Sequence, residues 1–191
     1  MTRLFLVRHG ETEWSRNGRH TSVTDLPLTE AGEAQARSLK RHLDPNDFQL
    51  VLSSPRRRAW HTAELAGFTG KHEPEIDDDL VEWAYGDFEG QTSVQIQEAI
   101  PDWTIWTHPS PGGETADDVR TRLDRLIAKV RGSGVEQAIC FAHGHSLRAL
   151  TVRWLGFELE RGGNFPLDTG TVSVLGEAKE LPALERWNSR P

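Results

Sequence analysis

Short apolar runs alternate along the chain with longer stretches in which apolar residues recur every three or four positions. The runs have the length and aliphatic content of buried strands, and they cover residues 3–7, 49–52, 137–142 and 171–175. The stretches have helical spacing, and they cover residues 29–43, 56–66, 115–131 and 146–155. Strands that alternate with helices predict an α/β fold, a three-layer α/β/α sandwich with a mainly parallel sheet.

Two of the predicted helices begin with recognisable start signals. Thr29 is placed as the N-cap of the helix over 29–43. Ser54 is placed as the cap of the helix over 56–66, with Pro55 at its first helical position.

The segment at about 72–113 interrupts this alternation. It is rich in acidic residues, tryptophan, glycine and proline, and only 93–100 has the pattern of a short helix. A long excursion in a compact domain is usually functional, so we expect it to form part of the wall of a site. No repeat or linker divides the chain, and we expect residues 1–191 to form a single domain.

Composition narrows the class of protein. The net charge of −7 argues against a general nucleic-acid binder. No apolar stretch approaches the ~20 residues that span a bilayer, and the first residues lack the pattern of a signal peptide. Cys140 is the single cysteine and cannot form an internal disulfide. A cytoplasmic location and no contact with membranes are therefore expected.

Polar, chemically active residues follow three of the predicted strands. The first strand ends in Arg8-His9-Gly10, the second leads into Ser53-Ser54-Pro55 and on to Arg58, and the third leads into His143-Gly144-His145. Carboxyl ends of neighbouring parallel strands meet at one edge of a sheet. Imidazole and guanidinium groups gathered there suit phosphoryl transfer. No carboxylate or cysteine accompanies the last motif at ligand spacing, so no metal site is predicted.

Together these motifs resemble the histidine phosphatase superfamily, which includes the cofactor-dependent phosphoglycerate mutases. The resemblance covers nearly the whole chain, and no single motif is specific by itself. Its motifs here are Leu6-Val7-Arg8-His9-Gly10-Glu11-Thr12, Thr24-Asp25-Leu26-Pro27-Leu28-Thr29, Ser53-Ser54-Pro55, Arg58-Ala59, Thr62-Ala63, Leu80-Val81-Glu82, Tyr85-Gly86-Asp87-Phe88-Glu89-Gly90, Gly112-Gly113-Glu114-Thr115 and Phe141-Ala142-His143-Gly144.

Within the superfamily the chain most resembles a branch with bacterial acid phosphatases and a fungal sedoheptulose bisphosphatase. The residues that carry this closer match are Thr12-Glu13-Trp14-Ser15, Asp77-Asp78-Asp79-Leu80, Glu82-Trp83, Trp103-Thr104-Ile105-Trp106, Ala142-His143-Gly144-His145-Ser146-Leu147-Arg148 and Leu167-Asp168-Thr169-Gly170.

The resemblance implies a role for each of five residues. His9 would be the nucleophile and would form a phosphohistidine. Arg8, Arg58 and His143 would hold the phosphoryl oxygens, and Glu82 would protonate the leaving oxygen and then activate water. The scheme needs no metal or other cofactor. It predicts better activity at mildly acidic pH, because Glu82 must begin protonated and His9 neutral.

The resemblance also implies residues that bind the substrate. Much of the family has asparagine after the position of Trp14, where this chain has Ser15; either Ser15 or Asn17 would then contact the phosphate. The other candidates lie in the predicted loops and after the third strand. They are Thr21, Ser22, Trp83, Tyr85, Trp106, Gly144, His145 and Arg148.

Hydrolysis is the leading interpretation of this chemistry. We expect a phosphomonoesterase that acts on small phosphorylated metabolites, with sugar phosphates or bisphosphates favoured. Phosphoglycerate mutase or bisphosphoglycerate phosphatase activity is the alternative, although Trp83-Ala84 stands where mutases typically carry Arg-His. A non-catalytic relative that binds phospho-ligands is a further alternative. The chain is expected to act without nucleic acid or membrane, and a homodimer stays open.

Overall fold

A six-stranded sheet forms the centre of the computed structural model, which describes residues 2–190. Its strand order is β3-β2-β4-β1-β5-β6. The first four in this order are parallel neighbours, whereas β5 runs antiparallel to both β1 and β6. The strands are β1 (Arg3–Arg8), β2 (Leu50–Ser53), β3 (Glu75–Ile76), β4 (Gln137–Ala142), β5 (Val172–Ala178) and β6 (Leu181–Ser189).

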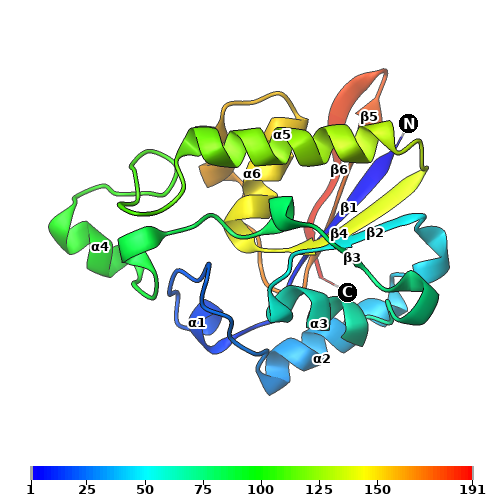
Figure 1. Ribbon diagram of the computed structural model, residues 1–191, viewed down its shortest axis with the longest axis horizontal. Helices are drawn as coiled ribbons and strands as arrows, with labels where there is room; N and C mark the ends of the chain where they lie inside the picture. Colours follow the sequence, from blue (N-terminus) through cyan, green and yellow to red (C-terminus); the bar gives the residue numbers. More distant parts are fainter. Residues whose placement is uncertain (1, 191) are drawn as a thin grey trace.

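Helices cover both faces of the sheet, which confirms the predicted α/β/α layers. Figure 1 shows α5 and α6 on one side of the sheet and α2 and α3 on the other. The helices are α1 (Glu13–Arg16), α2 (Glu30–Ser38), α3 (Arg57–Leu65), α4 (Ser93–Ala99), α5 (Ala116–Gly132) and α6 (Gly144–Trp154). Short 3₁₀ turns are η1 (Leu39–Arg41), η2 (Pro45–Asp47), η3 (Gly70–His72), η4 (Asp78–Leu80), η5 (Gly86–Phe88) and η6 (Leu159–Asn164).

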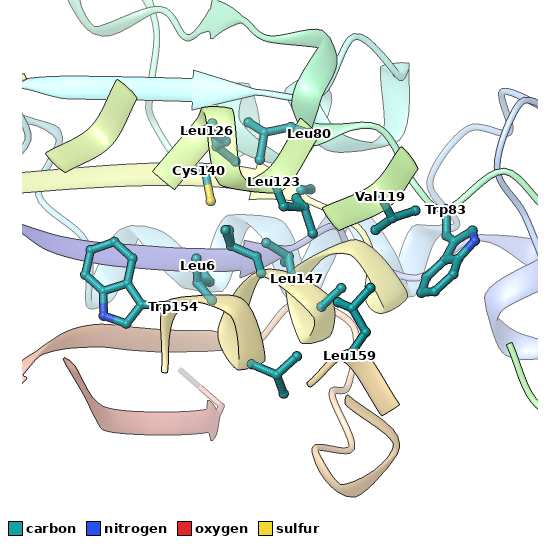
Figure 2. Packing of buried hydrophobic residues seen from close by; sticks show 14 of the residues in the cluster. Leu6, Leu80, Trp83, Val119, Leu123, Leu126, Cys140, Leu147, Trp154 and Leu159 are labelled. Carbon is teal, nitrogen blue, oxygen red and sulfur yellow. The ribbon is translucent and has the colours of Figure 1, made fainter. Parts of the chain in front are cut away.

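The two helical layers bury separate apolar clusters against the sheet. Leu123 and Leu126 of α5 and Leu147 of α6 pack with Leu6 and Cys140 of the strands, as Figure 2 shows. The cluster on the other face contains residues of α3, η1 and the strands, among them Ala63, Leu39 and Phe141. This burial on both faces explains why the central strands read as continuous apolar runs.

The register of the sheet brings the three predicted strand ends together. Arg8 pairs with Ala142 in the β1–β4 ladder, and Ser53 pairs with Phe141 in the β2–β4 ladder. The residues that follow these strands therefore leave the sheet at one edge and at nearly the same level.

Several details of the sequence-based prediction are wrong. Arg56, not Ser54, is the N-cap of α3, and it makes no side-chain capping bond; Ser54 and Pro55 precede the helix. The helix α6 begins at Gly144, two residues before the predicted start. The edge strands β3 and β6 were not predicted, because β3 has only two residues and β6 is largely exposed, with no buried alternation to mark it.

The segment at 72–113 connects the two layers through β3, η4, η5 and the helix α4 (Figure 1). It also supplies Glu82 and Tyr85 to a cavity at the carboxyl edge of the sheet. None of the helices within residues 2–190 has both the length and the apolar character needed to cross a membrane.

Candidate active site

A cavity of about 160 Å³ opens where β1 and β4 end. Its lining is polar or charged, apart from glycines and one aliphatic side chain. The lining residues are Arg8, His9, Thr12, Ser15, Gly18, Arg19, His20, Thr21, Glu82, Tyr85, Gly144, His145, Arg148 and Leu167.

The two ring nitrogens of His9 have different roles: Nδ1 orients the ring through a hydrogen bond, and Nε2 is free to react. Its side chain is buried, and Nδ1 lies 2.7 Å from the carbonyl oxygen of Gly10. A carbonyl only accepts hydrogen bonds, so Nδ1 carries the proton and Nε2 keeps its lone pair. Burial, reinforced by the charges of Arg58 and Arg8, lowers the pKa of His9 well below its ordinary value. His9 is therefore a neutral imidazole with Nε2 free to attack.

His143 lies beside His9, with ring centroids 5.3 Å apart. It is fully buried, and its Nε2 lies 2.7 Å from the hydroxyl oxygen of Ser54. Its Nδ1 is buried and makes no hydrogen bond within the described residues. Burial, then the charge of Arg58, lowers the pKa of His143 well below the ordinary value. His143 thus keeps one ring nitrogen available to an incoming group.

Arg58 is fully buried and is held by backbone carbonyls instead of a close carboxylate. It donates to the carbonyl oxygens of Thr21, Ser22 and Thr24 at 3.0–3.2 Å. Asp25 lies 3.7 Å away and is 40% exposed, so it offsets little of the guanidinium charge. The charge of Arg58 is consequently left to attract an anion.

Arg8 approaches the cavity from the end of β1. Its Nη1 donates to the carbonyl oxygen of Leu167. Gly144 passes close to the guanidinium, since a Cβ added there would lie 3.3 Å from the Arg8 Cζ atom. The absence of a side chain at Gly144 lets the start of α6 and Arg8 share this space.

Three unpartnered buried nitrogens belong to residues of this site. They are Nε of Arg8, Nε of Arg58 and Nδ1 of His143, none of which has a hydrogen-bond partner within residues 2–190. Buried donors without partners are rare in proteins. Two guanidinium groups with unused donors suit a bound dianion such as a phosphoryl group. Within the same residues, no three His, Cys, Asp or Glu side chains are gathered as metal ligands.

Glu82 lines the cavity together with His9 and Arg8, whereas Arg58 and His143 lie outside the cavity lining. Its side chain is buried, and both carboxylate oxygens accept hydrogen bonds from backbone amides. Oε1 accepts from Trp83 and Ser146 at 2.9 and 2.7 Å, and Oε2 accepts from His145 at 3.0 Å. The carboxyl group is thereby fixed at the N-terminus of α6, facing the same cavity as His9.

The predicted substrate-binding residues divide into two groups. The cavity lining includes Ser15, Thr21, Tyr85, Gly144, His145 and Arg148. It does not include Ser22, Trp83, Trp106 or the exposed Asn17. Trp83 is 2% exposed, donates to the carbonyl oxygen of Glu114 and packs edge-on against Trp106, so it belongs to the core.

Ser15 and Ser22 already use their hydroxyl groups locally. The Ser15 hydroxyl donates to the carbonyl oxygen of Thr12 and accepts from the Thr12 amide, which closes a capping box on α1. The Ser22 hydroxyl contacts the carboxylate of Glu89. Both residues thus shape the loops around the cavity.

Three ring-bearing residues in mutual contact line the cavity; sequence reasoning identified Tyr85 and His145 and missed His20. Tyr85 and His145 are joined by a contact of 2.6 Å between the phenol oxygen and Nδ1. His20 lies against Tyr85 with ring centroids 4.7 Å apart and the rings tilted by 39°, and burial lowers the pKa of His20 to about 4. Five lining residues were not predicted: Thr12, Gly18, Arg19, His20 and Leu167. Gly18, Arg19 and His20 directly precede the predicted Thr21, and this position in the sequence could have indicated them.

Comparison with known proteins places this site in a family. Residues 4–190 match the family model described as histidine phosphatase superfamily, branch 1. The chain is similar to an acid phosphatase of Mycobacterium tuberculosis, with 41% identity over 91% of this chain and 86% of the relative. It is also similar to the sedoheptulose 1,7-bisphosphatase of Saccharomyces cerevisiae, with 35% identity over 83% of this chain and 69% of the relative.

The fold agrees with the sequence comparison. A solved structure of an open reading frame product from Mycobacterium tuberculosis superposes with a TM-score of 0.93 and 37% identity, covering 99% of this chain and 98% of the other. The sequence match and the shared fold both extend across the strand ends that carry the cavity. The chain is therefore a phosphatase that belongs to branch 1 of the histidine phosphatase superfamily.

Proposed function

We propose that the protein hydrolyses monoesters of small phosphorylated metabolites through a phosphohistidine on His9. One observation carries this proposal: a neutral His9, with its Nε2 lone pair free, lies among the buried Arg58, the half-buried Arg8 and the buried His143. Positioning and charge stabilisation are most of what phosphoryl transfer requires. This group of side chains is suited to supply both.

The first step transfers the phosphoryl group to the enzyme. Nε2 of His9 attacks phosphorus while the bond from phosphorus to the ester oxygen breaks. Arg8, Arg58 and His143 hold the three other phosphoryl oxygens. Glu82 gives its proton to the departing ester oxygen, so the alcohol leaves neutral.

The second step releases phosphate. A water molecule attacks the phosphoryl group on His9, and the ionised Glu82 takes the proton from that water. The bond between phosphorus and Nε2 breaks, and His9 returns to its neutral form. Glu82 is protonated again and ready for the next ester.

The lining of the cavity supports a small polar substrate. Leu167 is its one aliphatic side chain, and Arg19, Thr21, His145 and Arg148 line it as polar or charged groups. Hydroxylated and anionic substrates satisfy such groups, whereas an apolar ester would leave them unpaired. The similar proteins named acid phosphatase and sedoheptulose 1,7-bisphosphatase agree with this class. Sugar phosphates and bisphosphates are therefore the favoured substrates.

Phosphate release by variants of the purified protein tests the proposal. A panel of phosphorylated metabolites identifies the substrate, and His9→Ala is then expected to reduce phosphate release by at least about a thousandfold, because the nucleophile is lost. His42→Ala is the matched control, since His42 is exposed and lies at the end of η1. Release at the wild-type rate from His9→Ala would refute the phosphohistidine mechanism.

Isomerase activity must be tested alongside. A phosphoglycerate supplied with its bisphosphate primer distinguishes the two reactions, because a mutase re-transfers the phosphoryl group and excludes water. Hydrolysis predicts net phosphate release. Efficient isomerisation without net release would make the protein a mutase instead.

A further inference from the structure

An ion pair between the buried Arg122 and the half-buried Glu114 contacts the chain on both sides of Glu82, outside the cavity lining. Arg122 of α5 is 6% exposed and binds the Glu114 carboxylate with two bonds, from Nε at 2.7 Å and from Nη2 at 3.1 Å. Its remaining Nη1 donates to the carbonyl oxygen of Asp79 at 2.8 Å. All three nitrogens of this guanidinium thus donate hydrogen bonds.

These contacts hold the backbone on both sides of Glu82. The Asp79 carbonyl bound by Arg122 lies three residues before Glu82. The Ala84 amide, two residues after it, donates to the Glu114 carboxylate at 2.9 Å, and the Glu114 amide donates back to the Ala84 carbonyl at 3.0 Å. The indole of Trp83 donates to the Glu114 carbonyl at 3.0 Å.

The packing around this clamp is tight. A Cβ added to Gly113 would lie 2.2 Å from the Ala84 carbonyl oxygen, so the two backbone segments touch. The segment that carries Glu82 has no helix or strand of its own between η4 and η5. Its position therefore depends on Arg122 and Glu114 as well as on the amides of His145 and Ser146 that bind the Glu82 carboxylate.

We propose that Arg122 and Glu114 are positioning residues that hold Glu82 at the distance needed to protonate the leaving oxygen. The inference rests on the proposed role of Glu82 as the acid. Proton transfer requires the carboxyl group within hydrogen-bond reach of the ester oxygen, about 2.6–3.2 Å. A small shift of the segment from 80 to 84 lengthens that contact while leaving His9, Arg8 and Arg58 in place.

The identity of the leaving group distinguishes this role from general support of the fold. A good leaving group departs without protonation, so its transfer to His9 does not need Glu82. An alkyl leaving group needs the proton. The ratio kcat/KM reports the steps up to alcohol release and is independent of later hydrolysis of the phosphohistidine. The experiment therefore compares kcat/KM for 4-nitrophenyl phosphate and glycerol 2-phosphate.

Arg122→Lys and Glu114→Gln are the test variants. Each is expected to lower kcat/KM for glycerol 2-phosphate about tenfold or more, which is a part of the rate factor of about 10²–10⁴ that general acids contribute. For 4-nitrophenyl phosphate, kcat/KM is expected to stay within about twofold of the wild-type value. The ratio of the two values does not depend on how much enzyme is folded, so partial unfolding cannot mimic the result. Equal losses on both esters in both variants would overturn the inference.

Two controls separate the inference from the proposed function. Arg125→Ala removes a neighbouring, exposed arginine that pairs with the Asp79 side chain, and it is expected to leave both values unchanged. Glu82→Gln is expected to show the same selective loss as the test variants, only larger. Equal losses in Glu82→Gln would contradict its role as the acid. A selective loss there without one in Arg122→Lys and Glu114→Gln would contradict only the positioning role.

Discussion

At the scale of single residues, burial keeps the histidines of the site uncharged. His9 and His143 are buried and His145 is half-buried. Loss of hydration, followed by the charges of Arg8, Arg58 and Arg148, lowers all three histidine pKa values well below the ordinary one. A protonated imidazole would repel the arginines and could not attack phosphorus. The charge that binds the anion therefore comes from arginine, and the nucleophile stays neutral.

This arrangement predicts how stability depends on pH. In the unfolded chain histidine takes up a proton near pH ~6.5, whereas the buried histidines resist it, so the unfolded state gains protons first. The free energy of unfolding that depends on these neutral histidines is fully present above pH ~6.5. It decreases as the pH drops below this value, by up to about 1.4 kcal/mol per pH unit for each such histidine. Thermal unfolding in phosphate-free buffer should show a lower Tm at pH 5.5 than at pH 7.5. An unchanged Tm would mean that these histidines are already protonated in the fold.

At the scale of elements, the loop over 21–25 fixes the position of the Arg58 side chain. Its carbonyls hold the guanidinium, and the Glu89 carboxylate accepts from the amides of Ser22 and Thr24. Burial tends to raise the pKa of Glu89, but the hydrogen bonds from Ser22 and Thr24 outweigh it and lower that pKa. The contribution of Glu89 to the stability of the loop is therefore fully present at pH values above the ordinary pKa of a carboxyl group. It is lost as the pH falls through the lowered pKa of Glu89.

Glu89→Gln tests, at neutral pH, whether Glu89 positions Arg58 through this loop. The amide nitrogen of glutamine cannot accept hydrogen bonds, so the variant loses part of the loop anchor. We expect inorganic phosphate to inhibit the variant about threefold to tenfold more weakly than the wild type, which corresponds to one lost hydrogen bond of about 1 kcal/mol. Glu98→Gln, on the exposed face of α4, serves as the control. Equal inhibition of all three proteins would show that Glu89 does not order Arg58.

At the scale of the whole molecule, the parallel strands assemble the site. The strands β2, β4 and β1 are neighbours, so Ser54, His143 and His9 leave the sheet at one edge. Apolar runs that end in polar residues made this convergence predictable from the sequence, along with the two layers of helices. Glu82 was predicted only through the family resemblance, because nothing in its acidic surroundings marks it as a buried group.

Other features could not be predicted, for physical reasons. Trp83 lies in the core, whereas Tyr85 lines the cavity. The contacts of Trp83 with Trp106 and Glu114 decide this difference, and they depend on tertiary packing. Ser54 precedes Pro55 in a pattern typical of a helix start, but its hydroxyl binds His143 instead. Local sequence cannot distinguish a capping serine from one that orients a distant imidazole, since both need the same short side chain.

Covalent labelling of His9 tests the phosphohistidine mechanism. The enzyme is mixed with a radiolabelled phosphate monoester and quenched within milliseconds, and the label is then mapped to a residue. We expect an acid-labile, base-stable phosphoryl group on His9, with at most one per chain, and no label in His9→Ala. Turnover of the same ester with the label on another side chain, or with none under conditions in which phosphoenzyme must accumulate, would contradict it.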